Sequence, residues 1–185
     1  MPTINFDEFL LVSILFLSPN LINYMGASIF HSQNGNSLSL DEVMEEILRF
    51  VQKHPERFYK VVIGSDSAAS NHVSLITAIT VWRVGNGAIH FWTRSELKTY
   101  HSFRDRIWDE AIKSITLAQE VRGRLGQELG DEFFWDGNEI HVDAGRNGIT
   151  RELVDGVMGM IRGYDFEPVV KPYSFGASSV ADRHT

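Results

Sequence analysis

The sequence of 185 residues contains no cysteine, which excludes a disulfide framework, a thiolate zinc site and a cysteine nucleophile. Basic residues are also few, because 17 Lys and Arg stand against 24 Asp and Glu, for a formal net charge of −7. A chain with this balance is not held to nucleic acid or to an anionic membrane mainly by bulk electrostatics. A nucleic-acid enzyme remains compatible with it, since an acidic active site contributes to the negative count.

Long hydrophobic runs are missing as well. The most apolar stretch, residues 9–17, is far shorter than the ~20 residues of a membrane-spanning helix. Asp7 and Glu8 precede it, where a secretory signal would carry Lys or Arg. We therefore expect residues 1–23 to be a leader or an extra packed segment, with a weak membrane or partner anchor as the alternative. Residues 24–185 are expected to form one cytoplasmic domain without membrane contact.

Turn and capping signals predict an alternating order of helices and strands. Ser39 and Glu42 form a capping box that starts a helix, and Gly85-Asn86-Gly87 predicts a hairpin, while residues 31–37 read as a polar loop. The elements expected after this loop are a helix from Ser39 to Pro55, strands over 60–66, 73–83 and 88–94, a helix over 102–125, a strand over 139–143, a helix from Thr150, a strand over 166–171 and a last helix over 174–184.

Connection lengths turn this order into a fold class. Strands joined by short connections pair antiparallel, whereas strands joined through a helix form right-handed parallel crossovers. We therefore predict an α/β domain with a mixed five-stranded sheet, three antiparallel strands followed by parallel strands, and helices on both faces.

Four acidic residues fall where these elements could bring them together. Asp66 and Asp143 end two strands that are expected to be parallel neighbours, on the order of 5 Å apart. Glu110 lies on the inward face of the long helix, and Asp182 on the last helix. Carboxylates this close repel unless a cation lies between them, and Mg²⁺ or Mn²⁺ prefers such oxygen ligands. An Asp at a strand end is also often a turn former or a helix cap.

A set of four carboxylates predicts a particular chemistry. It suits two divalent ions about 3.5–4 Å apart, which activate a water and stabilise the leaving oxygen during phosphodiester hydrolysis. Asp66, Glu110 and Asp143 would hold the ions, and Asp182 would assist.

Basic residues near the expected acidic site are candidates for substrate binding. The turn Gly145-Arg146-Asn147-Gly148 precedes a helix start, where Arg146 and Arg151 could contact a substrate phosphate. This turn lacks the lysine of a P-loop, so a simple tight turn is the more common interpretation. Lys171 leaves the last strand toward the acids and could bind phosphate or orient the attacking water; the alternative is a solvated lysine.

A second group of basic residues lies before and at the start of the long helix. Arg94, Lys98, Arg104 and Arg106 could follow a nucleic-acid backbone despite the negative total charge. Arg104 and Arg106 are two residues apart on a helix, so at most one of them faces a given partner.

Element order and local motifs resemble the ribonuclease H-like superfamily. More narrowly, Ile63-Gly64-Ser65-Asp66-Ser67, Ile140-His141-Val142-Asp143, residues 150–154 and the ending 171–185 are similar to the YkuK-type predicted ribonuclease H-like proteins. The resemblance covers about residues 24–185. The first motif of that family commonly reads G-T-D-S-Q, and here Ser65 and Ala68 replace its Thr and Gln.

This resemblance implies metal-dependent nuclease or strand-transfer chemistry. By position, Asp66 and Asp143 correspond to metal ligands, Glu110 to the acid on the helix and Asp182 to the fourth acid. We therefore expect a divalent-metal-dependent nuclease, with Mg²⁺ or Mn²⁺ as cofactor and RNA, DNA or a hybrid as partner. The alternative is a non-catalytic module that binds nucleic acid or protein on the same scaffold.

Overall fold

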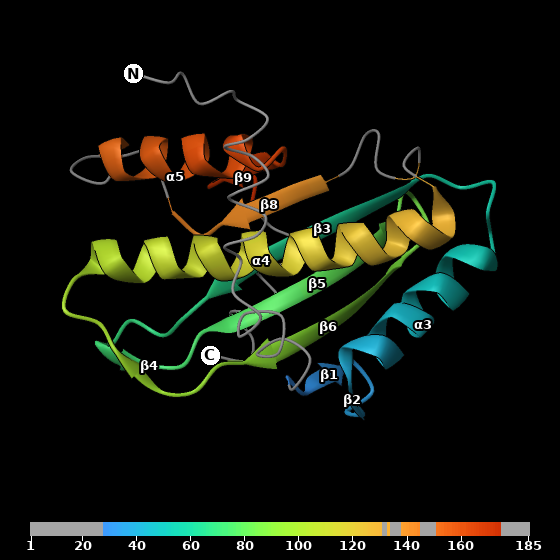
Figure 1. Ribbon diagram of the computed structural model, residues 1–185, viewed down its shortest axis with the longest axis horizontal. Coiled ribbons are helices and arrows are strands. Elements are labelled where there is room, and N and C mark those ends of the chain that lie inside the picture. Colours follow the sequence, from blue (N-terminus) through green and yellow to red (C-terminus); the bar gives the residue numbers. More distant parts are fainter. Residues whose placement is uncertain (1–27, 131–132, 134–137, 145–150, 175–185) are drawn as a thin grey trace, which may run out of the picture.

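A mixed β-sheet forms the centre of the structure, a computed structural model that describes residues 28–130, 133, 138–144 and 151–174. Seven strands pair in the order β2-β1-β6-β5-β3-β8-β9, and β4 pairs with β7 in a separate ladder (Figure 1). The strands are β1 (Phe30–Ser32), β2 (Ser37–Leu38), β3 (Tyr59–Asp66), β4 (His72–Val73), β5 (Ile76–Arg83), β6 (Ala88–Arg94), β7 (Lys98–Thr99), β8 (Asn138–Val142) and β9 (Glu167–Val170). The helices are α3 (Leu40–Gln52), α4 (Phe103–Leu129) and α5 (Arg151–Gly163).

Five of the seven strands, from β6 to the edge strand β9, confirm the predicted mixed α/β architecture. β6, β5 and β3 pair antiparallel, whereas β3, β8 and β9 pair parallel, as the short and the helical connections require. The strand predicted over residues 88–94 coincides with β6, and α4 continues to Leu129 rather than ending at residue 125. This order places the carboxyl ends of β3 and β8 next to each other.

Two short strands depart from the prediction. The segment 31–37, expected to be a polar loop, contains parts of β1 and β2. These two strands pair with each other, and β1 also pairs with β6. They extend the sheet to seven strands. A strand of three residues is too short to show a hydrophobic period, and it is held here by ladder hydrogen bonds and by the buried side chain of Phe30. The strand expected over 73–83 is divided, because β4 pairs with β7 instead.

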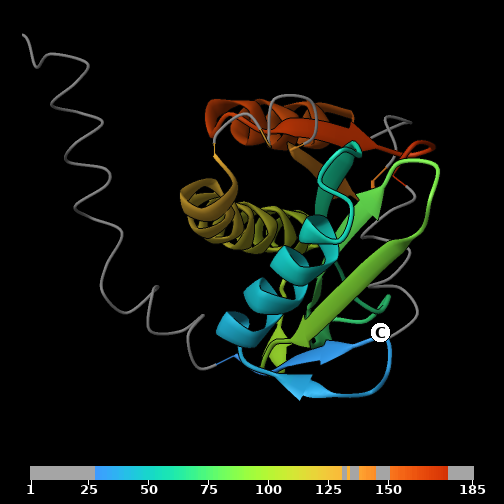
Figure 2. The same ribbon diagram turned by 90° about the vertical axis from the view of Figure 1, so that its right-hand side faces the viewer.

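All three described helices pack on the same face of the sheet, as Figures 1 and 2 show. Alternate residues of the strands face these helices and share one continuous apolar core with them. Helices were predicted on both faces, and none of the described helices covers the other one. The helix predicted over 174–184 lies, apart from Ser174, outside the described residues, and so does the leader predicted over 1–23. Within the described ranges, no helix combines the length and the hydropathy that a membrane crossing requires.

Helix α3 begins at the predicted capping box. The Ser39 side chain accepts a hydrogen bond from the backbone N–H of Glu42 at 3.2 Å, and the Glu42 carboxylate accepts one from the backbone N–H of Ser39 at 2.7 Å. The apolar stripe of the helix, including Val43, Ile47 and Val51, is buried. The capping box thus sets where the helix begins, and the buried stripe sets which side of it faces the core.

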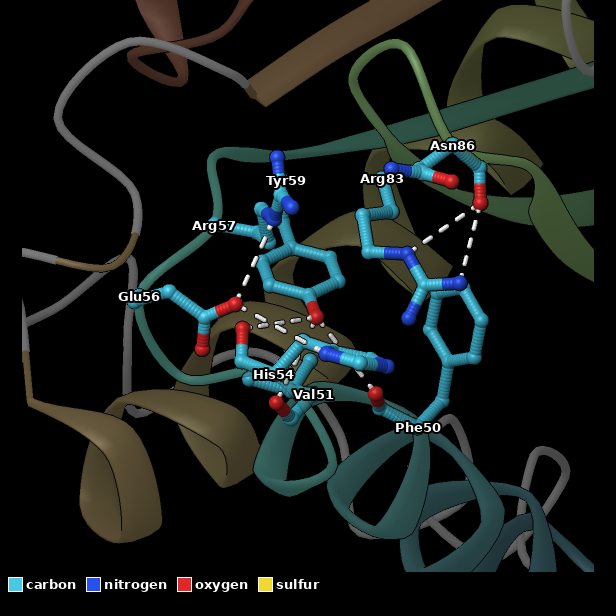
Figure 3. A network of polar contacts seen from close by, with 8 residues as sticks. All are labelled: Phe50, Val51, His54, Glu56, Arg57, Tyr59, Arg83 and Asn86. Carbon is cyan, nitrogen blue, oxygen red and sulfur yellow. Dashed lines mark hydrogen bonds and ion pairs between the residues drawn. The ribbon is translucent and has the colours of Figure 1, made fainter.

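Tyr59 joins the end of α3 to the start of β3 (Figure 3). Its hydroxyl lies 3.3 Å from the carbonyl oxygen of Val51, in the last turn of the helix, and 3.1 Å from that of His54, in the turn that follows. The guanidinium of Arg83 lies over the ring of Phe50. This network anchors the end of β3 that lies opposite to Asp66.

Helix α4 runs across β3 and β8. Its N-cap is Ser102, whose side chain accepts a hydrogen bond from the backbone N–H of Asp105 at 3.1 Å. Residues three or four apart along the helix, including Ile107, Ala111 and Leu117, are buried against the sheet. Glu110 shares this buried side, so the packing of α4 carries a carboxylate to the sheet.

A polar cluster on the other face of the sheet ties β3 to β8. Lys60 Nζ lies 2.6 Å from Glu139 Oε1, and His141 Nε2 lies 3.1 Å from Glu139 Oε2. The bond to His141, followed by that to Lys60, lowers the pKa of Glu139 to about 2 although partial burial acts in the opposite direction. These contacts hold the parallel register that aligns the ends of both strands.

Replacing Glu139 by Gln is expected to lower the free energy of unfolding at pH 7 by about 2 kcal/mol, because two charge-assisted hydrogen bonds are lost. The pKa of Glu139 lies at about 2 in the folded chain and near its ordinary 4.5 in the unfolded chain. Its contribution is therefore complete above pH 4.5 and is lost as the pH falls from there toward 2. Urea unfolding between pH 7 and pH 3 measures this dependence.

The matched control is Glu167→Gln. Glu167 is the partner of Glu139 in the register of β9, and its side chain is exposed. It should change stability by less than about 0.5 kcal/mol. Equal losses in the two variants would contradict the role given to Glu139.

Candidate metal centre

Three of the four predicted acids lie in the described residues, at the carboxyl ends of β3 and β8. Asp66 is the last residue of β3, and Asp143 follows β8 directly. The two strands are parallel with Ser65 opposite Val142, so Asp66 and Asp143 are the next positions in register. Glu110 reaches the same end of the sheet from α4, and its charge interacts with both aspartates. The fourth acid, Asp182, lies outside the described residues.

Glu110 carries the most perturbed carboxyl group of the three. It is only 9% exposed, and burial is the main cause that raises its pKa to about 7. The charges of Asp66 and Asp143 raise this pKa further, whereas a hydrogen bond from Ser67 and the charge of Arg106 lower it. The site therefore concentrates negative charge where water is largely excluded.

Hydroxyl groups around Asp66 connect β3 to β5 and to α4. Ser65 Oγ lies 2.8 Å from Thr77 Oγ1 and 2.9 Å from Ser114 Oγ, and all three side chains are buried. Ser67 Oγ donates to Glu110 Oε1 at 2.6 Å. The serines on either side of Asp66 thus fix α4 and the carboxylate of Glu110 beside the strand end.

Sequence reasoning did not assign a role to these hydroxyl groups. The signal available was the run Ser65-Asp66-Ser67 at a strand end, where side chains on both sides of the aspartate are polar. Because Thr commonly stands at the position of Ser65 in the family that the sequence resembles, the hydroxyl group is retained while the methyl group is lost.

Lys171 lies at the acidic end of the sheet, as the sequence predicted. β9 pairs with β8 so that Val170 is opposite Val142, and residue 171 therefore comes beside Asp143. Lys171 Nζ lies 2.8 Å from Asp143 Oδ1. The lysine side chain is 56% exposed, and an ion pair this accessible contributes little to stability.

Of the two arginines that were predicted to contact a substrate phosphate near the turn after β8, the structure describes one. Arg146 lies outside the described residues. Arg151 begins α5, and its guanidinium lies 3.9 Å from the carboxylate of Asp155 in the same helix. Among the described residues, Arg151 contacts none of the three acids.

The basic residues before and at the start of α4 make different contacts. Arg106 Nη1 donates to the carbonyl oxygens of Ala68 at 2.9 Å and of Ser70 at 3.0 Å, in the loop that follows Asp66. Lys98 is paired with Asp109 at 2.7 Å, whereas Arg104 is exposed. Of the two arginines, Arg106 therefore faces the candidate centre, in agreement with their spacing.

The oxygen atoms of this centre match the ligands that Mg²⁺ and Mn²⁺ prefer. Among the described residues, no group of three or more His, Asp and Glu side chains is arranged to hold a metal ion. The chemistry of the set nevertheless fits a divalent cation, because the repulsion that raises the pKa of Glu110 is relieved by positive charge between the carboxylates. A cation held by Asp143 would compete with the ammonium group of Lys171 for that carboxylate.

Comparison with known proteins gives two matches. A family model described as Ribonuclease H-like matches residues 42–185, a range that includes β3, α4 and β8. The "Uncharacterized protein YkuK" of Bacillus subtilis (strain 168) is 30% identical over 167 residues, which cover 85% of this chain and 96% of that protein. No solved structure matches. With the mixed sheet already described, these matches show that the chain belongs to the ribonuclease H-like family.

Proposed function

We propose that this protein is a nuclease that hydrolyses phosphodiester bonds of nucleic acid with Mg²⁺ or Mn²⁺. The observation that supports this most directly is the convergence of Asp66, Glu110 and Asp143 at one end of the sheet. Membership of the ribonuclease H-like family supports a nuclease-type scaffold. RNA, DNA and their hybrid are all substrates compatible with this chemistry.

Each acid has a defined part in this proposal. Asp66, Glu110 and Asp143 hold the ions, with Asp182 as the fourth acid. Bound ions of this kind stabilise the attacking and the leaving oxygens of an in-line displacement. Ser67 holds Glu110 Oε1 at 2.6 Å and thereby orients that carboxylate. Burial of Glu110 and Asp66 keeps water from screening their charges.

Basic side chains supply the contacts to the substrate. Lys171 is the closest described cation to Asp143 and is exposed to solvent, so its ammonium group can exchange the carboxylate for a phosphate. Arg146 and Arg151 are proposed to contact phosphates further along the strand. Because the chain carries a net charge of −7, binding depends on such local cations rather than on the total charge.

Substituting Asp66 or Asp143 by Asn is expected to reduce cleavage of labelled RNA, DNA and hybrid substrates in Mn²⁺ by at least about 100-fold, because an amide replaces an anionic ligand. The control is Asp165→Asn, at an exposed turn position with a positive φ that Asn adopts readily. All three variants should keep the thermal midpoint of the parent within a few degrees. Cleavage at the parental rate by either active-site variant would refute the assignment.

A second function is favoured by one observation, the 2.8 Å ion pair between Lys171 and Asp143. It gives an acid of the centre a cationic partner from the chain itself. A protein that keeps this pair permanently would be a non-catalytic module that binds nucleic acid or protein without a metal ion.

Calorimetric titration with Mn²⁺ separates the two functions. For the nuclease, the parent binds Mn²⁺, Asp66→Asn abolishes the binding, and Lys171→Met strengthens it several-fold because the competing ammonium group is removed. For the binding module, neither parent nor variants bind Mn²⁺, and affinity for nucleic acid is the same in chelator as in Mn²⁺.

A further inference from the structure

A pocket of about 160 Å³ opens beside the acidic centre. It lies between the first turn of α4 and the loop that joins β3 to β4. The residues that line it are Ala69, Ser70, Asn71, Tyr100, Ser102, Phe103 and Arg106. We refer to it below as the Arg106 pocket. Of the acids of the candidate centre that the structure describes, Asp66, Glu110 and Asp143, none lines it.

Arg106 is held so that part of its guanidinium remains available to a ligand. Its Nη1 donates to the carbonyl oxygens of Ala68 and Ser70, and the guanidinium carbon lies 5.3 Å from the centre of the Phe103 ring. Among the described residues, Nε and Nη2 of Arg106 have no hydrogen-bond partner. A fixed guanidinium with two N–H groups available matches the paired oxygens of a phosphate.

The surroundings of the guanidinium favour an anion. The pocket adjoins the first turn of α4, a helix of 27 residues, whose N-terminal end carries a partial positive charge. Lys98 and Asp109 neutralise each other through a 2.7 Å contact, and the Tyr100 hydroxyl donates to the same Asp109 at 2.5 Å. The carboxylate of Asp109 is therefore already bound by Lys98 and by Tyr100, and neither Asp109 nor Asp105, the acid of the first turn, lines the pocket.

The position of the pocket relates it to the acidic centre. Arg106 precedes Glu110 by four residues on α4, about one helical turn or ~5–6 Å along the axis. The loop that Arg106 holds also carries Ser67, which donates to Glu110. A phosphate bound in the Arg106 pocket would therefore lie about one helical turn from the carboxylates.

We infer that the Arg106 pocket binds a backbone phosphate of the nucleic acid that neighbours the bond to be cut. This inference rests on the proposed nuclease function for the identity of the ligand. The ligand chemistry is a phosphodiester, and inorganic phosphate is the free form that would compete for the same donors.

The test measures binding rather than cleavage, in the Asp66→Asn background and in chelator. Fluorescence anisotropy follows the affinity for labelled single-stranded RNA, single-stranded DNA and an RNA–DNA hybrid. Arg106→Gln is expected to weaken binding about 10-fold and to reduce the slope of log K against log[salt] by about 0.7–0.9, the value for one phosphate contact.

Two further variants keep the test decisive if Arg106→Gln disturbs the loop. Asn71→Asp introduces a negative charge at an exposed lining position with no change in shape, and should also weaken binding about 10-fold. The control Arg104→Gln removes an exposed arginine two residues from Arg106 and should change affinity less than 2-fold. Millimolar inorganic phosphate should compete with the probes in the background protein, and lose this effect in Arg106→Gln.

The outcomes separate this inference from the proposed function. Unchanged affinity and salt slope in both Arg106→Gln and Asn71→Asp would overturn the phosphate site, as would absence of binding to all three probes. If binding depends on Arg106 but the parent protein cleaves none of the substrates, the proposed nuclease function is refuted and the phosphate site is supported.

Discussion

The repulsion between carboxylates at the ends of β3 and β8 is the constraint on which the rest of the site depends. Parallel pairing of these strands places Asp66 and Asp143 at adjacent positions in register, and the packing of α4 adds the buried Glu110. The chain tolerates this arrangement because hydroxyl groups, Lys171 and Arg106 offset part of the charge. The negative charge that these groups leave uncompensated is the basis of the proposed cation site.

Much of this architecture was accessible from the sequence. The hairpin at Gly85-Asn86-Gly87, the capping box at Ser39 and the period of α4 are local signals, and each predicted its element correctly. The predicted strand ends alone were enough to place Asp66 and Asp143 at the same end of the sheet. Their chemical role follows only from the family and from proposed chemistry, since an acid at a strand end has several ordinary uses.

Other features had no local signal. β1 and β2 are too short to show periodicity. They form because β6 offers hydrogen-bond partners to β1, and β1 in turn offers them to β2. The pairing of Lys171 with Asp143 joins residues on neighbouring strands whose register depends on the whole parallel half of the sheet. Contacts between distant segments depend on how the whole chain packs, so they cannot be predicted from the individual residues.

Hydrogen bonds in both directions join the short loop after Asp66 to α4. Ser67 of the loop donates to Glu110, and Arg106 of the helix donates to the carbonyl oxygens of Ala68 and Ser70. The backbone that follows Asp66 is therefore held at three points by side chains that contact α4 or belong to it. Arg106 holds this loop through one nitrogen atom, so the residue that would bind a ligand in the Arg106 pocket is also the residue that fixes the chain next to Asp66.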